Sequence, residues 1–107
     1  MTKEPAMTRE QAIRAIEIGI EAAQMMKEKG YHILATGEMG IGNTTTSSAV
    51  ASVLLDIPVE RMTGRGAGLS TEGLNRKITA IKNAIALHQP DKTDAIDVLS
   101  KVGGFDI

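Results

Sequence analysis

The sequence feature that most constrains the fold is a glycine-rich stretch at 37–45, GEMGIGNTT. The residues before it, 31–36 (YHILAT), form a β-prone run typical of a short, buried parallel strand. After it, apolar residues recur with helical period up to Leu54. A strand, a glycine turn and a helix in this order favour an anion site, because backbone N–H groups and about half a positive charge gather at the helix N-terminus. Three glycines within the six residues 37–42 also exceed what a tight turn requires.

This glycine stretch matches neither of the two common nucleotide-binding loops. In the Walker A pattern Gly-x-x-x-x-Gly-Lys-Ser/Thr, Gly37, Gly42 and Thr44 match, but Asn43 stands where the lysine must be. The β- and γ-phosphates of a nucleotide would lose their cation, which argues against an NTPase. The dinucleotide fingerprint Gly-x-Gly-x-x-Gly is absent as well. Asn43 and Thr44 can instead cap the following helix or bind a ligand.

A long amphipathic helix is predicted over residues 8–29. Thr8 and Gln11 fit a capping box at its start, in which each side chain satisfies a backbone donor of the first turn. Apolar residues then recur on one face, and Gly30 follows a run of charged residues at the end of the pattern.

Two further helices are predicted after a second loop at 57–69, which contains the glycine cluster GRGAG. The first begins at the N-cap Ser70 and carries a clear apolar stripe until Pro90 forbids its continuation. The second is short, is capped by Asp91 and is stopped by the glycines at 103–104.

Charged side chains near the two glycine clusters are the candidates for chemistry. Lys77 borders the apolar stripe, so it either lies on the surface, extends its stem over apolar neighbours, or reaches a phosphate at the first loop. Arg65 lies between two glycines, and it likewise either lies on the surface or reaches a phosphate at the first loop. Glu38 would repel a phosphate, so it suits a hydroxyl, a ribose or a developing cation, or it is a solvated loop residue.

Other polar residues are assigned structural roles. His32 and His88 lie too far apart in the sequence to show metal-ligand spacing, and no metal site is predicted. The Ser/Thr run at 44–48 lacks a Gly-x-Ser-x-Gly nucleophile motif, so we expect it to cap a helix.

Composition narrows the class of protein. A chain of 107 residues is one domain or a piece of one. Its formal net charge of -1 argues against a nucleic-acid binder, and the absence of cysteine excludes disulfides and thiolate zinc sites. No apolar run reaches the ~20 residues of a membrane span, and the N-terminal residues do not resemble a secretory signal, so a cytoplasmic protein is expected. Aromatic residues are limited to Tyr31 and Phe105, which is unusual for a complete core.

The loop GEMGIGNTT resembles the signature loop of the nicotinate-nucleotide–dimethylbenzimidazole phosphoribosyltransferase family. Further similarities follow in order at 4–8 (EPAMT), at 64–69 (GRGAGL), at Lys77 with its neighbour Ile78, and at 102–107 (VGGFDI). The resemblance covers essentially the whole chain. Because chains of that family are much longer, it implies that residues 1–107 form one internal segment of the enzyme's large domain.

This resemblance implies an α/β fold, in which the chain is a helix-rich part of a Rossmann-like three-layer domain with a short parallel strand at about 31–36. It implies transfer of phosphoribosyl from nicotinate mononucleotide to 5,6-dimethylbenzimidazole, which gives α-ribazole phosphate and nicotinate in the synthesis of the lower ligand of cobalamin. A homodimer without a cofactor, and with no nucleic-acid or membrane partner, is expected.

The resemblance also implies roles for particular residues. Glu38 matches an acidic residue of the active site in a supporting catalytic role. The substrate-binding residues that it implies, chiefly at the phosphate of the mononucleotide, are Gly40, Ile41, Gly42, Asn43, Thr44, Gly66 and Lys77. The general base of the family is a glutamate near the C-terminus of the full-length enzyme and has no counterpart here, so this chain alone is expected to be inactive.

Two alternatives remain open from the sequence. The same loop could serve a non-catalytic module that binds a nucleotide or phosphate. The chain could also be a helical interaction domain in which the glycine clusters are only turns.

Overall fold

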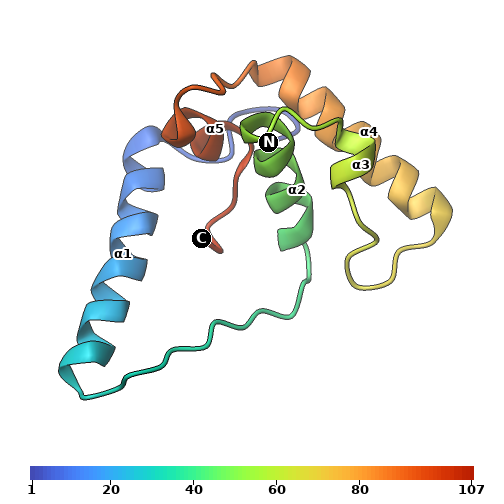
Figure 1. The fold of residues 1–107 in the computed structure, drawn as a ribbon. Coiled ribbons are helices and arrows are strands. Elements are labelled where there is room, and N and C mark those ends of the chain that lie inside the picture. The colour runs from blue at the N-terminus through green and yellow to red at the C-terminus, as the bar shows by residue number, and fades with distance from the viewer.

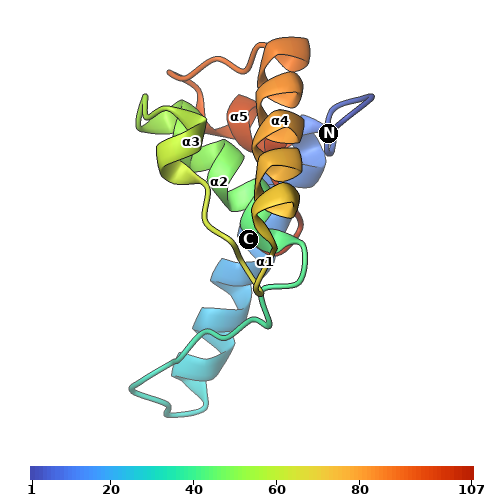
Figure 2. The same cartoon turned by 90° about the vertical axis from the view of Figure 1, so that its right-hand side faces the viewer.

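The computed structural model describes all residues, 1–107, and contains five helices (Figure 1). In chain order they are α1 (Arg9–Glu28), α2 (Asn43–Leu54), α3 (Val59–Met62), α4 (Thr71–His88) and α5 (Ala95–Val102). Helices α2 to α5 pack on one another, whereas α1 contacts α5 alone and extends away from the group (Figures 1 and 2). None of these helices combines the length and apolar character that crossing a membrane would require.

Helix α1 begins and ends where the sequence predicts. The Thr8 hydroxyl accepts from the backbone N–H of Gln11 at 3.2 Å, and the Gln11 side chain accepts from the backbone N–H of Thr8 at 2.9 Å, so the capping box is complete. At the other end Gly30 has a φ of +86°, a conformation that glycine adopts without a steric penalty.

The predicted parallel strand at 31–36 is wrong for this structure. These residues belong to an extended connection that leads from α1 to α2 (Figures 1 and 2). A parallel strand needs a neighbouring strand to satisfy its backbone groups, and the chain supplies no other strand. Backbone groups of residues 32–41 accordingly make no backbone–backbone hydrogen bond, and the side chain of Ile33 is 87% exposed.

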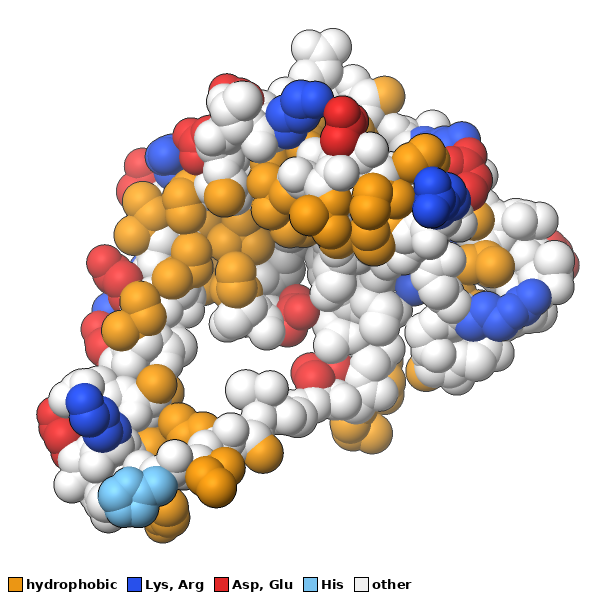
Figure 3. Space-filling view, in the orientation of Figure 1, with side chains coloured by type: hydrophobic (Ala, Val, Ile, Leu, Met, Phe, Trp, Pro, Cys, Tyr) orange, Lys and Arg blue, Asp and Glu red, His pale blue; other side chains and the backbone are white.

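The core is small and lies between α2, α3, α4 and α5. It consists of the buried residues Ala49, Val59, Ile81, Ala84, Val98 and Val102. A second cluster of Met7, Ala12 and Leu99 attaches the start of α1 to α5. Many other apolar side chains remain at the surface, where they form a band across the face shown in Figure 3.

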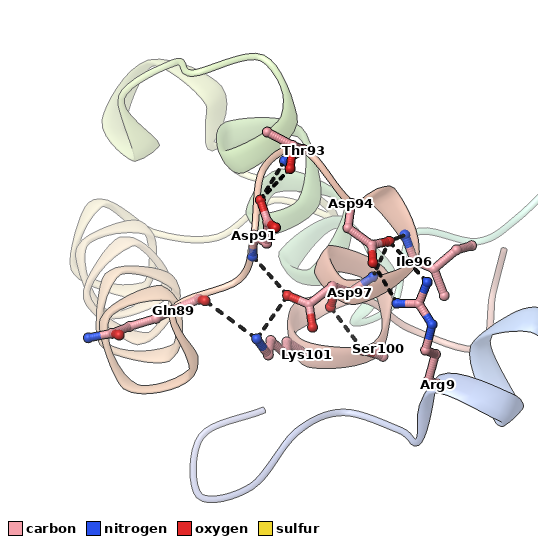
Figure 4. Close-up of polar contacts among 9 residues, drawn as sticks. All are labelled: Arg9, Gln89, Asp91, Thr93, Asp94, Ile96, Asp97, Ser100 and Lys101. Carbon is pink, nitrogen blue, oxygen red and sulfur yellow. Dashed lines mark hydrogen bonds and ion pairs between the residues drawn. The ribbon is translucent and has the colours of Figure 1, made fainter.

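Two local features differ from the predictions. Residues 57–69 are not all loop, because the short α3 begins directly after Pro58, whose fixed φ suits a helix start. Asp94, and not Asp91, caps α5: its carboxylate accepts from the backbone N–H groups of Ile96 and Asp97 at 3.0 and 3.1 Å (Figure 4).

Asp91 forms a separate turn before α5. Its carboxylate accepts from the backbone N–H of Thr93 at 2.9 Å and from the Thr93 hydroxyl at 2.7 Å. The Asp97 carboxylate accepts from the backbone N–H of Asp91 and from Lys101, both at 2.8 Å (Figure 4). These bonds stabilise the connection between α4 and α5.

Candidate functional site

The first glycine loop enters α2 with two residues in left-handed backbone conformations. Gly40 has a φ of +80° and Gly42 a φ of +88°. Gly42 is the N-cap of α2, and no side chain caps the helix. The prediction that the Ser/Thr run caps the helix is therefore wrong, and of the two roles left open for Asn43 and Thr44 the capping role is not the one seen, since all of these residues follow the N-cap. The first N–H groups of α2 are left without a side-chain acceptor, as an anion-binding helix start requires.

Glu38 folds back onto its own loop. Its carboxylate accepts from the backbone N–H of Gly40 and from the side-chain amide of Asn43, the latter at 2.6 Å. The carboxylate thus connects the start of the loop to the first residue of α2 and restrains the glycines between them. The remaining amide oxygen of Asn43 is buried and has no hydrogen-bond donor.

The second glycine loop approaches the first at Gly66. Gly66 has a φ of +57°, and a Cβ atom added there would lie 2.7 Å from the Thr44 hydroxyl oxygen and 3.5 Å from Lys77 Nζ. Both the backbone conformation and the lack of space therefore require glycine at this position. Arg65 donates to the backbone oxygen of Leu69 at 2.8 Å and to the Thr71 hydroxyl at 3.1 Å, which secures the loop to the start of α4.

Lys77 projects from α4 into the junction of the two loops. Its side chain is almost fully buried, with the residue only 7% exposed, so it is not a plain surface lysine. The ammonium donates to the Thr44 hydroxyl at 2.8 Å and to the backbone oxygen of Gly64 at 3.1 Å. No carboxylate oxygen lies within 4.0 Å of it. Burial consequently lowers the pKa of Lys77 below its ordinary value.

The two loops and Lys77 line one cavity of about 330 Å³. In Figure 2 both loops lie at the lower end of α4, where that helix begins. The predicted site residues that line the cavity are Gly40, Ile41, Gly42, Thr44, Gly66 and Lys77. Glu38 and Asn43 do not line it, although they hold the loop that does.

Other lining residues were not singled out from the sequence. They are Thr45, Ala67, Gly68 and Leu69. Gly68, with a φ of +102°, could have been found from its place in the second glycine cluster. A larger cavity of about 470 Å³ lies between α2 and the C-terminal residues, but its lining is mainly apolar and Asp106 is its charged residue. That cavity does not suit a phosphate, whereas the one at Lys77 does.

Comparison with known proteins shows the family to which the chain belongs. A family model described as "Phosphoribosyltransferase" matches residues 1–107. The chain belongs to this phosphoribosyltransferase family. It is 62% identical over 107 residues to the nicotinate-nucleotide–dimethylbenzimidazole phosphoribosyltransferase of Acetivibrio thermocellus, covering 100% of this chain and 30% of that protein. The enzyme of the same name from Ruminiclostridium cellulolyticum is 62% identical over 105 residues, covering 98% of this chain and 30% of that protein.

A solved structure has the same helical arrangement. The crystal structure of CobT from Thermus thermophilus superposes with a TM-score of 0.88 at 43% identity and covers 98% of this chain and 31% of that one. The chain thus spans about 30% of the length of the relatives that it matches.

Proposed function

We propose that this chain forms the phosphate-binding part of an enzyme that transfers phosphoribosyl from nicotinate mononucleotide to 5,6-dimethylbenzimidazole. The observation that carries the proposal is the buried ammonium of Lys77, which has no carboxylate partner and lines a cavity between two glycine loops. A buried charge without a counter-ion is costly, and a bound anion would offset that cost. The names of the relatives supply the class of substrate.

The lining of the cavity suits a phosphate monoester in three respects. Lys77 supplies a cation, the uncapped start of α2 supplies backbone N–H groups, and the glycines allow the ligand to approach the main chain. Arg65 adds a second positive charge at the same cavity. A direct charge-assisted hydrogen bond from Lys77 would contribute roughly 1.5–3 kcal/mol to binding.

The proposed reaction takes place at C1′ of the ribose. The bond from C1′ to the nicotinate nitrogen breaks, a bond from C1′ to a benzimidazole nitrogen forms, and the proton of the benzimidazole passes to a base. The transition state has oxocarbenium character, so it needs a held phosphate, a nearby carboxylate and that base. Lys77 and the first loop hold the phosphate. The resemblance assigns the carboxylate to Glu38, which in this structure is bound by its own loop outside the cavity. No residue of this chain matches the family's general base, which we place outside these 107 residues.

The proposal also covers the domain, the oligomeric state and the compartment to which the site belongs. We place residues 1–107 as a single segment in the Rossmann-like large domain of a cytoplasmic homodimer that uses no cofactor. Light scattering on a full-length enzyme that carries this segment tests the dimer, since a monomer at all concentrations would contradict it.

One observation favours a second candidate, a non-catalytic phosphate-binding module. The Glu38 carboxylate is occupied by Gly40 and Asn43 of its own loop and does not line the cavity. A loop held in this way binds an anion without a carboxylate directed at the ribose.

The decisive experiment replaces the matching residues of the Acetivibrio thermocellus relative by this chain. Nicotinate release with dimethylbenzimidazole is measured for the chimera and for the chain alone, and calorimetry measures binding of nicotinate mononucleotide to both. Lys77→Ala is compared with Lys82→Ala, because Lys82 lies on the same helix but pairs with Glu60. If the chimera releases nicotinate, and Lys77→Ala but not Lys82→Ala reduces that turnover, the proposed enzymatic function is supported.

The other outcomes separate the alternatives. Binding by the chimera without turnover supports the module. If neither the chimera nor the chain alone binds nicotinate mononucleotide, both proposals are contradicted. The helical interaction domain is then the remaining alternative. Turnover by the chain alone, within about tenfold of the relative, would show that a base acts within these 107 residues, since losing such a group costs ~10²–10⁴-fold.

A further inference from the structure

Thr44 differs from three other hydroxyl residues of α2, Thr46, Ser47 and Ser48. The hydroxyls of Thr46 and Ser47 donate to the backbone oxygen of Asn43, and that of Ser48 donates to the backbone oxygen of Thr44. Each of these hydroxyls therefore has its hydrogen-bond acceptor within α2 itself. The Thr44 hydroxyl instead accepts from Lys77, which lies 33 residues away on α4.

The place of the Thr44 hydroxyl is restricted by two neighbours. Lys77 Nζ lies 2.8 Å from its oxygen. A Cβ atom at position 66 would lie 2.7 Å from the same oxygen, so the glycine there leaves room for the hydroxyl. The contact therefore joins three elements, namely α2, the second glycine loop and α4.

We infer that Thr44 is a positioning residue, which fixes the Lys77 ammonium at the cavity so that one of its hydrogens faces the bound phosphate. An ammonium has three hydrogens, and those directed to Thr44 and to the backbone oxygen of Gly64 account for two. The third has no acceptor in the protein. Thr44, having accepted one hydrogen bond, still has its own hydrogen to donate to the same ligand.

The role in ligand binding rests on the function proposed above, whereas the positioning of Lys77 does not. The test therefore begins without ligand. The titration of the Lys77 side chain is followed by NMR in Thr44→Val, Thr44→Ser and the control Ser47→Ala, which leaves α2 intact and does not touch Lys77. Valine keeps the shape of threonine and removes the hydroxyl, and serine keeps the hydroxyl.

Loss of an acceptor from the charged lysine disfavours its protonated form. Thr44→Val is expected to lower the pKa of Lys77 further, by about one to two units, while Thr44→Ser and Ser47→Ala leave it close to the wild-type value. The desolvated ammonium has one other charged group lining the same cavity, Arg65, which is retained in every variant. Affinity for inorganic phosphate should fall about tenfold or more in Thr44→Val and change less than about threefold in Thr44→Ser.

The outcomes are distinct. An unchanged Lys77 titration in Thr44→Val overturns the inference, and so does an equal shift in Thr44→Ser or Ser47→Ala, because that pattern indicates a general disturbance of the helix. If Thr44→Val does not fold, Thr44→Ala is interpreted in the same way. Wild-type protein that binds no phosphate, combined with the expected pKa shift, would reject the proposed function and leave the positioning role standing.

Discussion

The Arg9 guanidinium donates to the Asp94 carboxylate at 2.7 Å and thereby joins the first residue of α1 to the N-cap of α5 (Figure 4). Asp94 serves both helices, since the same carboxylate accepts from the backbone N–H groups that begin α5. Because α1 packs on α5 alone, this residue has more influence on the placement of α1 than a surface ion pair usually has.

Two substitutions of Asp94 separate its two roles. Asp94→Asn keeps a capping oxygen and loses the charge, so thermal unfolding should shift little. Asp94→Ala loses both and should lower the melting temperature by several degrees. Melting curves by circular dichroism measure the difference, and equal losses in the two variants would show that the ion pair dominates the cap.

The same residue predicts a loss of stability in acid. Arg9 and the backbone N–H groups of α5 hold the pKa of Asp94 below its ordinary value. A carboxyl with a lowered pKa in the folded state stabilises the fold above its unfolded pKa, and this contribution is lost as the pH falls through the folded value. Unfolding measured from neutral to acid pH should therefore be less acid-sensitive in Asp94→Asn than in wild type. A parallel pH dependence of the two proteins would contradict the assignment.

Lys77 is expected to lower the stability of the fold and to raise the affinity for the phosphate of the ligand. Lys77→Met removes a buried charge that has no carboxylate partner, so the melting temperature should rise. The same variant should lose roughly 1.5–3 kcal/mol in affinity for nicotinate mononucleotide, and much less for the nucleoside without its phosphate. Calorimetry with both ligands checks this, and equal losses would place Lys77 away from the phosphate.

Phosphate binding should weaken in alkali at a lower pH than an exposed lysine would produce. Burial lowers the pKa of Lys77 from its ordinary 10.5, and only the charged form binds an anion well. Affinity should decline as the pH rises through that lowered pKa. Over the same interval the fold gains stability, because the unfolded state then binds more protons. Lys77→Met is the control, and it should show neither dependence.

Two glycines of the second loop offer a matched pair. Gly66→Ala meets both a positive φ and the Thr44 oxygen, so it should displace the loop and weaken phosphate binding about tenfold or more. Gly64→Ala meets nothing within 4 Å and has no positive φ, so binding should be close to wild type. Titration of both variants with inorganic phosphate decides, and similar affinities would contradict the close approach of the two loops.

Local signals in the sequence predicted the helices well. Thr8, Ser70 and Gly30 act within one turn of their own position, and all three mark helix ends in the structure. The choice between Asp91 and Asp94 was missed because both residues can cap a turn, and contacts with α1 and α5 decide which one caps the helix. The short α3 was hidden within a loop whose glycines dominate the pattern.

Features that depend on distant partners could not be predicted. Residues 31–36 have the composition of a strand, but strand pairing is non-local and the chain offers no neighbour. The resemblance named six of the residues that line the cavity, yet no pattern indicates that Thr44 and Lys77 meet, because they are 33 residues apart. The position of Glu38 outside the cavity likewise follows from hydrogen bonds that only the folded loop reveals.

The connection between α1 and α2 has a consequence for how the chain would break. Its backbone is exposed and without backbone–backbone hydrogen bonds over 32–41, so it is the segment that a protease can enter most easily. A cut there would not release α1, because the backbone N–H groups of Ala6 and Met7 donate to Lys101 and Ser100, and Met7 and Ala12 pack on Leu99. The two pieces would remain together as a nicked complex that separates only when α5 unfolds.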